Sequence, residues 1–344
     1  MSNKQPFLID LSVLLLFHAR VDCFLQVWEE VKKARPARLF FYQDGPREGT
    51  KDFEGIAQCR ELVKDENIDW ECEVHRLYQK KNYGNDPSEF LSQRWAFSQT
   101  DKCVFFEDDD VPSQSFFLFC KEMLDKYEND ERITMIAGFN TDERTMDIKE
   151  SYFFTRVFSS WGWASWSRVV NGWDGEYRFV KDRNQFKLLQ KKVNQYHQKK
   201  DMTKMVIDHA HSGKECFESI SWSYMLLHDG MAIMPSVNLI NNVGYGSGAH
   251  YEGGKLSLIP KRLRKIFTMQ RLELEFPLTH PKEVKEYPDY QKRFYLVNAW
   301  NNPWRKVQYS LEELWLNLLH GNFQNIVKSI KNRILKTFGL KKYT

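Results

Sequence analysis

The 344-residue sequence lacks several features that would assign it to a particular class. It has no Gly-, Ser- or Pro-rich linker, no repeat and no low-complexity segment, which favours one elaborated domain with an appendage. Its six cysteines show no CxxC spacing and several lie in apolar runs, as reduced core residues of a cytosolic protein do. No apolar run reaches the ~18 residues of a membrane span, because Asp10 interrupts residues 7–17, and no cleavable signal pattern is present. We therefore expect a cytoplasmic protein that does not cross the membrane.

Two further absences bear on function. No Gly-rich phosphate loop follows the first apolar run, residues 12–19, which argues against a sugar-phosphate nucleotidylyltransferase. The net charge is only +4 and the basic residues are not interleaved with a reader motif, so we expect no nucleic-acid partner. Aromatic residues, by contrast, make up 15% of the chain. They suit an enzyme with carbohydrate- or lipid-facing surfaces, although a bulky core alone would also explain them.

Strands and helices are expected to alternate over the first 110 residues. Apolar runs predict strands, helical spacing of apolar residues predicts helices, and Gly or Pro marks the turns between them. The expected strands are residues 12–19, 37–42, 70–77 and 103–106, and the expected helices are residues 21–34, 52–65 and 87–100. Beyond these we expect a helix over 114–127 and strands over 132–138 and 152–158. This order predicts an α/β fold with a mixed, mostly parallel sheet and helices on both faces.

Four consecutive acids, Glu107 to Asp110, directly follow the apolar run 103–106. A strand without polar alternation is typical of a parallel sheet covered on both faces, where ligands bind at the carboxyl ends of strands. Adjacent carboxylates repel each other, and a divalent cation such as Mg²⁺ or Mn²⁺ with a bound polyphosphate would relieve that repulsion. The alternative is a solvated acidic loop, with Ser113 capping the next helix. In a parallel sheet Arg20 and Asp44 would follow strand ends beside the acids, the one suited to a diphosphate and the other to a base or ribose.

The most distinctive aromatic segment is residues 159–166, which contains Trp161, Trp163 and Trp166. Aromatic faces beside small residues suit stacking on a sugar ring. Packing in the core is the equally weighted alternative for these tryptophans.

Seven segments in the same order resemble a metal-dependent glycosyltransferase of the GT-A fold, in the bacterial group distantly similar to N-acetylglucosaminyltransferase I. They cover roughly residues 9–252 and include His18-Ala19-Arg20, Tyr42-Gln43-Asp44-Gly45-Pro46-Arg47, Arg94-Trp95-Ala96, Phe106-Glu107-Asp108-Asp109, Gly138-Phe139-Asn140, Trp161-Gly162-Trp163 and the run from Asn238 to Gly246. The resemblance implies a UDP-sugar-dependent hexosyltransferase. It is expected to use Mn²⁺ or Mg²⁺ in the assembly of a bacterial surface polysaccharide.

The resemblance also assigns roles to individual residues. Glu107, Asp108 and Asp109 match a DxD-like motif, in which Asp109 binds the metal, with Asp110 as a second candidate, while Glu107 and Asp108 face sugar and ribose. Arg20 is expected to bind the diphosphate and Asp44 the uracil, and Arg94 and Trp163 are further candidates for donor binding. An inverting enzyme needs a carboxylate base. Relatives often have Asp where this chain has Ser223, so Glu218 is the first substitute and Asp229 the second.

The end of the sequence lies outside this resemblance. In residues 323–344 apolar side chains recur at helical spacing, six Lys or Arg are added, and no acid occurs after Glu313. This pattern predicts a helix on an anionic membrane surface, whereas a packed terminal helix is the alternative. We expect a glycosyltransferase domain over 1–305, with its nucleotide half at about 1–112 and its acceptor half at about 113–305. A basic tail over 306–344 would hold it at the inner face of the cell membrane.

Three functions remain open on the sequence alone. The first is transfer from a UDP-sugar to a glycan or a lipid-linked saccharide. The others are a sugar-phosphate nucleotidylyltransferase, which shares the nucleotide-binding sheet, and a non-catalytic sugar-binding relative, which Ser223 in the place of a base would suit.

Overall fold

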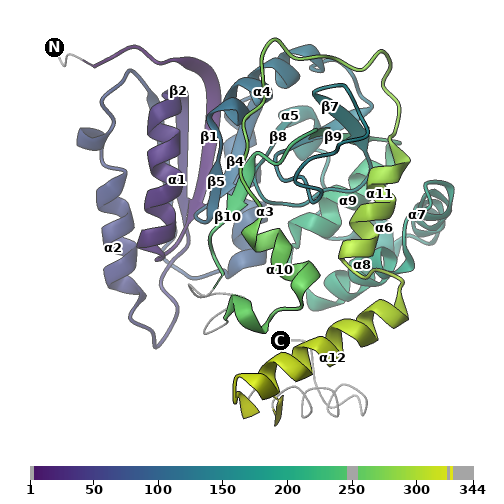
Figure 1. Cartoon of the computed structure of the whole chain (residues 1–344). Coiled ribbons are helices and arrows are strands. Elements are labelled where there is room, and N and C mark those ends of the chain that lie inside the picture. Colours follow the sequence, from purple (N-terminus) through teal and green to yellow (C-terminus); the bar gives the residue numbers. More distant parts are fainter. Residues whose placement is uncertain (1–3, 246–254, 324–325, 328–344) are drawn as a thin grey trace.

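The structure, a computed structural model, describes residues 4–245, 255–323 and 326–327, and within these residues eight strands form one central sheet (Figure 1). The strand order is β3-β2-β1-β4-β8-β6-β9-β7. These strands are β1 (Ile9–Phe17), β2 (Pro36–Gln43), β3 (Glu73–Tyr78), β4 (Lys102–Glu107), β6 (Ile133–Ala137), β7 (Tyr152–Thr155), β8 (Trp163–Trp166) and β9 (Met231–Pro235). A separate antiparallel ladder joins β5 (Asp110–Pro112) to β10 (Ile240–Asn242).

Most neighbouring strands of the sheet are parallel. Strand β1 runs parallel to β2 and β4, β2 to β3, and β6 to β9. Strand β8 is antiparallel to β4 and β6, and β7 is antiparallel to β9. The expected mixed, mostly parallel sheet is therefore confirmed. Its parallel strands, β1 to β4 with β6 and β9, end at the same edge.

Helices cover both faces of this sheet (Figure 1). They are α1 (Val21–Ala34), α2 (Asp52–Leu62), α3 (Asn85–Phe97), α4 (Gln114–Lys126), α5 (Ser167–Val170), α6 (Arg178–Lys181), α7 (Arg183–Gln195), α8 (Lys200–Ser212), α9 (Phe217–Leu227), α10 (Lys261–Thr268), α11 (Pro288–Val297) and α12 (Pro303–Leu319). Strand β1 contacts both α3 and α4; α4 packs with α1, whereas α3 packs with α5 and α9. The helical covering explains why β1 and β4 lack polar alternation, since both of their faces are buried.

Much of the aromatic content forms the core. Four tryptophans are at most 2% exposed and belong to the same buried cluster as the apolar residues of β1, β2 and β4; they are Trp28, Trp70, Trp163 and Trp222. The six cysteines are free thiols, and all except the half-buried Cys72 are buried, as expected for reduced core residues. The bulky core thus accounts for a large share of the aromatic residues.

Some element boundaries differ from the sequence-based prediction. The first strand begins at Ile9 rather than residue 12, and the strand expected over 152–158 ends at Thr155. There Arg156 leaves the sheet and pairs with Glu286. The short strands β5, β8, β9 and β10 were not predicted, because runs of three to five residues carry little periodic signal.

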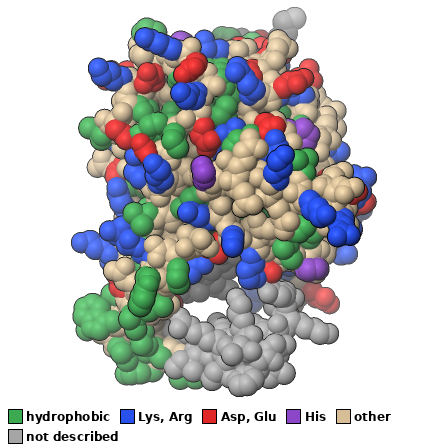
Figure 2. All heavy atoms as spheres, turned by 90° about the vertical axis from the view of Figure 1, so that its right-hand side faces the viewer, with side chains coloured by type: hydrophobic (Ala, Val, Ile, Leu, Met, Phe, Trp, Pro, Cys, Tyr) green, Lys and Arg blue, Asp and Glu red, His purple; other side chains and the backbone are tan. Residues whose placement is uncertain are grey.

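Helix α12 lies across the predicted boundary at residue 305, which falls in its first turn. Figure 2 shows hydrophobic side chains gathered along the lower edge of the molecule, where Figure 1 places α12. The predicted lipid-binding segment, residues 323–344, lies almost entirely outside the described residues. Among the helices that are described, none has the length and apolar character of a membrane span.

Candidate active site

Arg20 and two of the consecutive acids meet at the carboxyl ends of neighbouring strands. Strands β1 and β4 are parallel with Leu16 opposite Glu107, so the residues that follow them leave the sheet side by side. The Arg20 guanidinium lies 2.8 Å from the Asp109 carboxylate and also pairs with Asp108. Burial disfavours the charge on Arg20, but the carboxylates of Asp108 and Asp109 outweigh it and raise the pKa of the guanidinium. The structure therefore brings these predicted residues together.

Asp109 is the acid whose surroundings leave a coordination position open. Its Oδ2 atom pairs with Arg20, whereas Oδ1 is buried and has no hydrogen-bond partner within the described part of the chain. Burial raises the pKa of Asp109 to about 6, with Arg20 opposing the shift and Asp108 adding to it. Gly244 lies directly over the pair, because a Cβ there would come within 1.8 Å of Asp109 Oδ2. Only glycine lets the chain pass at this point.

The cluster holds more negative charge than Arg20 can balance. Burial and the charges of the three aspartates raise the pKa of Glu107 well above its ordinary value. Burial and the charge of Asp109 do the same for Asp110. Such a group of carboxyls either retains protons or takes a cation.

One carboxylate oxygen of the acidic cluster is suited to a hard divalent cation. In residues 4–245, 255–323 and 326–327, no three His, Cys, Asp or Glu side chains are grouped so as to hold a metal by themselves. Mg²⁺-type sites, however, commonly take one or two protein carboxylates and complete their shell with phosphates and water. The unpartnered Oδ1 of Asp109 fits such a site, in which substrate supplies further ligands.

Asp110 faces the interior instead of the strand-end crevice. Its carboxylate accepts hydrogen bonds from Gly162 N at 3.0 Å and Asn242 Nδ2 at 3.2 Å, and it is fully buried. These bonds connect the β4 end to the start of β8 and to β10. Binding of a metal by Asp110 stays a prediction, and it would require the carboxylate to exchange one of these partners.

Asp44 is also engaged within the protein. Its carboxylate accepts hydrogen bonds from the backbone N–H groups of Gly45, Tyr83 and Gly84, at 2.9 to 3.0 Å. The side chain is buried, so it holds the loop after β2 against the loop before α3. Recognition of a base by Asp44 stays a prediction, and it would require the carboxylate to exchange at least one of these partners.

Two of the predicted donor-binding residues lie elsewhere. Arg94 on α3 donates to the carbonyl of Val170 at 2.8 Å, where α5 ends. Trp163 is fully buried, with the nearly parallel rings of Phe97 and Phe217 at 6.4 and 5.0 Å. Because no face of the Trp163 ring is open, this ring packs in the core and cannot stack on a sugar. This corrects the prediction for Trp163.

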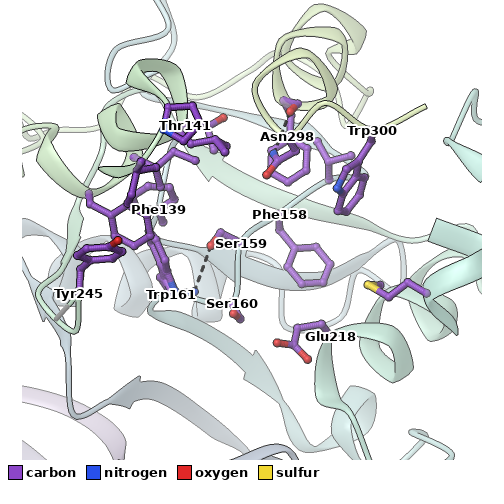
Figure 3. A pocket seen from close by; sticks show the side chains of 18 of the residues that line it. Phe139, Thr141, Phe158, Ser159, Ser160, Trp161, Glu218, Tyr245, Asn298 and Trp300 are labelled. Atoms are coloured by element: carbon purple, nitrogen blue, oxygen red, sulfur yellow. Dashed lines mark hydrogen bonds between the residues drawn. The ribbon is translucent and has the colours of Figure 1, made fainter. Parts of the chain in front are cut away.

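The second feature of the site is a pocket of about 640 Å³. Its wall includes Trp161, which directly precedes the Gly162 N–H that donates to Asp110. Figure 3 shows Phe158, Ser159, Ser160 and Trp161 along one side, all from the segment between β7 and β8. Other walls come from α8, α9, α10, α11 and α12. The pocket thus offers aromatic rings together with hydroxyl groups.

Glu218 reaches this pocket from the first turn of α9, with its carboxylate on the side of Ser160 (Figure 3). A second carboxyl, Glu89 of α3, lies within electrostatic range of both Glu107 and Glu218. Burial and those two charges raise the pKa of Glu89 well above its ordinary value. The charge of Glu89 therefore interacts with one carboxyl at the strand end and with one in the pocket.

Sequence reasoning did not single out Glu89. The signal was present, because Glu89 shares a helix face with the buried residues Gln93, Ala96 and Phe97. An acid on an otherwise buried face of a helix is rare unless it has a function or a partner.

His209 is a second pocket residue that the sequence did not indicate. It lies in the last turn of α8, and its Nδ1 atom is 3.0 Å from Ser219 Oγ. Burial lowers the pKa of His209, while the charges of Asp86 and Asp208 oppose the change. A largely neutral imidazole at neutral pH is thus available in the pocket.

Asp229, the second candidate for the base, and Ser223, which takes the place of the base in relatives, lie outside the pocket lining. Asp229 follows the other end of α9, which lies about 14 Å along the helix from Glu218, and it pairs with Lys192 and Tyr196. Ser223 is fully buried in α9, and its hydroxyl has no partner among the described residues. Of the candidates on α9 and after it, Glu218 alone lines the described pocket, so the geometry argues against Asp229 as the base.

The sequence matches no protein-family model and no curated protein. Among solved structures, mouse xyloside xylosyltransferase 1 is 12% identical with a TM-score of 0.32, covering 64% of this chain and 81% of that one. A UDP-glucose pyrophosphorylase is 8% identical with a TM-score of 0.34, covering 69% and 94%. The inositol-1-phosphate CTP transferase of T. maritima is 13% identical with a TM-score of 0.29, covering 47% and 73%. At these values the likenesses assign no function, and the resemblance to N-acetylglucosaminyltransferase I stays a sequence-based expectation.

Proposed function

We propose that the protein is a metal-dependent glycosyltransferase that moves a sugar from a UDP-sugar to a saccharide acceptor. The proposal rests on two observations, the meeting of Arg20 with Asp108 and Asp109 at the strand ends and a pocket lined by Glu218. The first group suits a diphosphate with its metal ion, and the second suits a sugar and the removal of a proton. A transferase needs both next to each other.

On the donor side, the sequence resemblance assigns the diphosphate to Arg20 and the metal to Asp109. A phosphate oxygen would replace a carboxylate as a partner of the Arg20 guanidinium, which is suited to bind either. When bound, Mn²⁺ or Mg²⁺ would neutralise the negative charge that develops on the departing UDP. Asp108 and Glu107 would then face ribose and sugar, respectively.

On the acceptor side, Glu218 is the proposed base. Its carboxylate lines the pocket, and an acceptor hydroxyl placed there would transfer its proton to Glu218 as it attacks the sugar carbon. Trp161 and Phe158 offer ring faces to the acceptor, and the largely apolar lining excludes water that would otherwise compete as acceptor. Attack from the side opposite the leaving UDP inverts the anomeric centre.

The acceptor and its location are part of the proposal. A glycan or a lipid-linked saccharide at the inner face of the bacterial cell membrane fits the basic, apolar pattern at the end of the sequence. Assembly of a surface polysaccharide is the process in which such an acceptor would occur.

A panel of UDP-sugars tests the function. The full-length protein is incubated with each sugar and Mn²⁺, with and without saccharide acceptors, and the released products are measured. A glycosyltransferase releases UDP, whereas a nucleotidylyltransferase given a nucleoside triphosphate and a sugar phosphate releases pyrophosphate. A sugar-binding protein releases neither, even where calorimetry detects a bound saccharide.

The metal requirement is tested in the same assay. Excess chelator should stop UDP release, and added Mn²⁺ or Mg²⁺ should restore it, because a single Arg20 leaves the acidic cluster with excess negative charge. Full activity in chelator would contradict the role of Asp109 as a metal ligand. That result would not test whether the protein is a transferase, which the identity of the released product decides.

A further inference from the structure

Helix α12 presents an apolar face to solvent. Trp304 is 83% exposed, Leu311 61% and Trp315 58%. The exposed large apolar side chains recur every three or four residues along the helix and are Trp304, Val307, Leu311, Leu314, Trp315, Leu318 and Leu319. Apolar surface of this length on one helix marks an interaction site rather than scattered exposed residues.

The face of α12 that meets the rest of the protein is polar. Tyr309 donates its hydroxyl to the carbonyl of Val297 at 2.9 Å, and Glu312 accepts from Lys261 N at 2.8 Å. Asn317 is buried and lines the pocket. A helix on the surface of a globular protein ordinarily buries its apolar stripe and exposes its polar one. Helix α12 does the reverse, so its apolar face is suited to a partner other than the described core.

Positive charge lies beside this face on the neighbouring helix and in the sequence that follows, whereas α12 itself carries two basic and two acidic residues, Arg305, Lys306, Glu312 and Glu313. Lys261, Arg262 and Lys265 of the neighbouring α10 are exposed, and Arg262 lies within electrostatic range of Tyr309 on α12. From Leu314 to the end, the sequence contains six Lys or Arg residues and no Asp or Glu. A partner that covers the apolar face must therefore tolerate, and would be attracted by, positive charge.

We propose that α12 docks on an anionic lipid bilayer through its apolar face. Two tryptophans on that face suit the boundary between headgroups and acyl chains, where Trp is enriched. The adjacent basic residues would bind anionic headgroups, each adding about 1 kcal/mol of attraction near such a surface. A second copy of the chain would bring like charges together, which disfavours it as the partner. The helix would lie in the plane of the interface, and docking does not depend on the proposed transferase activity.

Cosedimentation of the full-length protein with vesicles tests the proposal. Vesicles of phosphatidylcholine alone and of phosphatidylcholine with phosphatidylglycerol are used, at low and high salt. The wild type should bind the anionic vesicles, and high salt should weaken binding because it screens the headgroup charge. The variant Leu311→Gln, Trp315→Gln, Leu318→Gln should bind at least about tenfold more weakly.

The matched control replaces three exposed apolar residues on other elements. Phe53, Leu118 and Met146 are 65%, 52% and 82% exposed. The variant Phe53→Gln, Leu118→Gln, Met146→Gln should bind vesicles like the wild type. Circular dichroism and sedimentation velocity on all three proteins establish that each is folded and report its oligomeric state.

A second measurement locates the contact. Lipids brominated on the acyl chain should quench part of the tryptophan fluorescence of the wild type, and the variant Trp304→Phe, Trp315→Phe should lose most of that quenching. The proposal is overturned if the wild type ignores anionic vesicles, or if the α12 variant binds them like the wild type. It is also overturned if α12 changes only convert a dimer to a monomer.

Discussion

The two halves of the chain contribute to the site in different ways. Before β5, the charged groups stand within three residues of a strand end, and parallel pairing of β1 with β4 brings Arg20 beside Asp108 and Asp109. After β5, the pocket takes side chains from many separate segments between Phe139 and Asn317. Short segments at the strand ends thus determine the position of the charged groups, whereas long-range packing determines the shape of the pocket.

This contrast separates two kinds of residue that look alike in sequence. At the strand ends, a substitution should remove chemistry and leave the fold. Around the pocket, adjacent residues of the same type should differ, because one supports the core and the other contacts substrate. The following substitutions would sharpen or break that distinction.

The largest effect is expected for Asp109→Asn. The change keeps the size of the side chain but removes the charge of the acid whose Oδ1 has no partner in the described structure. UDP release should fall by about 100- to 1,000-fold, the order seen when preorganised charge stabilisation is lost. Assays at saturating Mn²⁺, with circular dichroism for the fold, measure this.

The control for that variant is Asp289→Asn, at a side chain that is 53% exposed and pairs with Lys292 one helical turn away. It should keep the wild-type rate. A near-normal rate in Asp109→Asn would move the metal ligand to another acid.

The second expectation compares Trp163→Ala with Trp161→Ala. Trp163 is fully buried, so its truncation should lower the free energy of unfolding by about 3–5 kcal/mol. Trp161 is half-buried and lines the pocket, so its truncation should cost less stability and raise KM for the acceptor. Denaturant unfolding and acceptor titrations give the two values. Equal stability losses would mean that both residues belong to the core.

The third expectation concerns the base. Glu218→Gln should lower kcat about 100-fold, the usual order for loss of a general base, with donor affinity unchanged. Asp229→Asn is the matched variant, and it should keep its rate because Asp229 lies at the far end of α9. A loss of rate in Asp229→Asn with a normal rate in Glu218→Gln would make Asp229 the base. Unchanged rates in both would point to His209, which also lines the pocket.

The smallest effect is expected for Asp44→Ala. Three backbone N–H groups would lose their acceptor, and the free energy of unfolding should fall by about 2 kcal/mol. UDP affinity, measured by calorimetry, should fall as well, because the ordered loop borders the proposed nucleotide site. Equal UDP affinity in the two proteins would exclude base recognition by Asp44 or by the loop that it holds.

Local sequence pattern was enough to predict the alternation of strands and helices in the first half and the position of the acids at a strand end. Apolar runs without polar alternation identify buried strands, and parallel strands end at one edge, so the meeting of Arg20 with Asp108 and Asp109 followed from local pattern. Short strands such as β5 and β10 did not follow, because three residues hold no measurable period.

Which side chains face the pocket depends on long-range packing. The side chains of Glu89 and Asp110 are buried because other elements pack around them. Residue type alone does not distinguish these two carboxyls from exposed Asp and Glu residues nearby in the sequence. Trp161 and Trp163 are two residues apart and in one strand would point to the same side. Gly162 between them has a φ of +58°, which turns the chain just before β8 begins. One ring therefore lines the pocket and the other is in the core, a difference set by contacts with Phe97 and Phe217 that are far away in sequence.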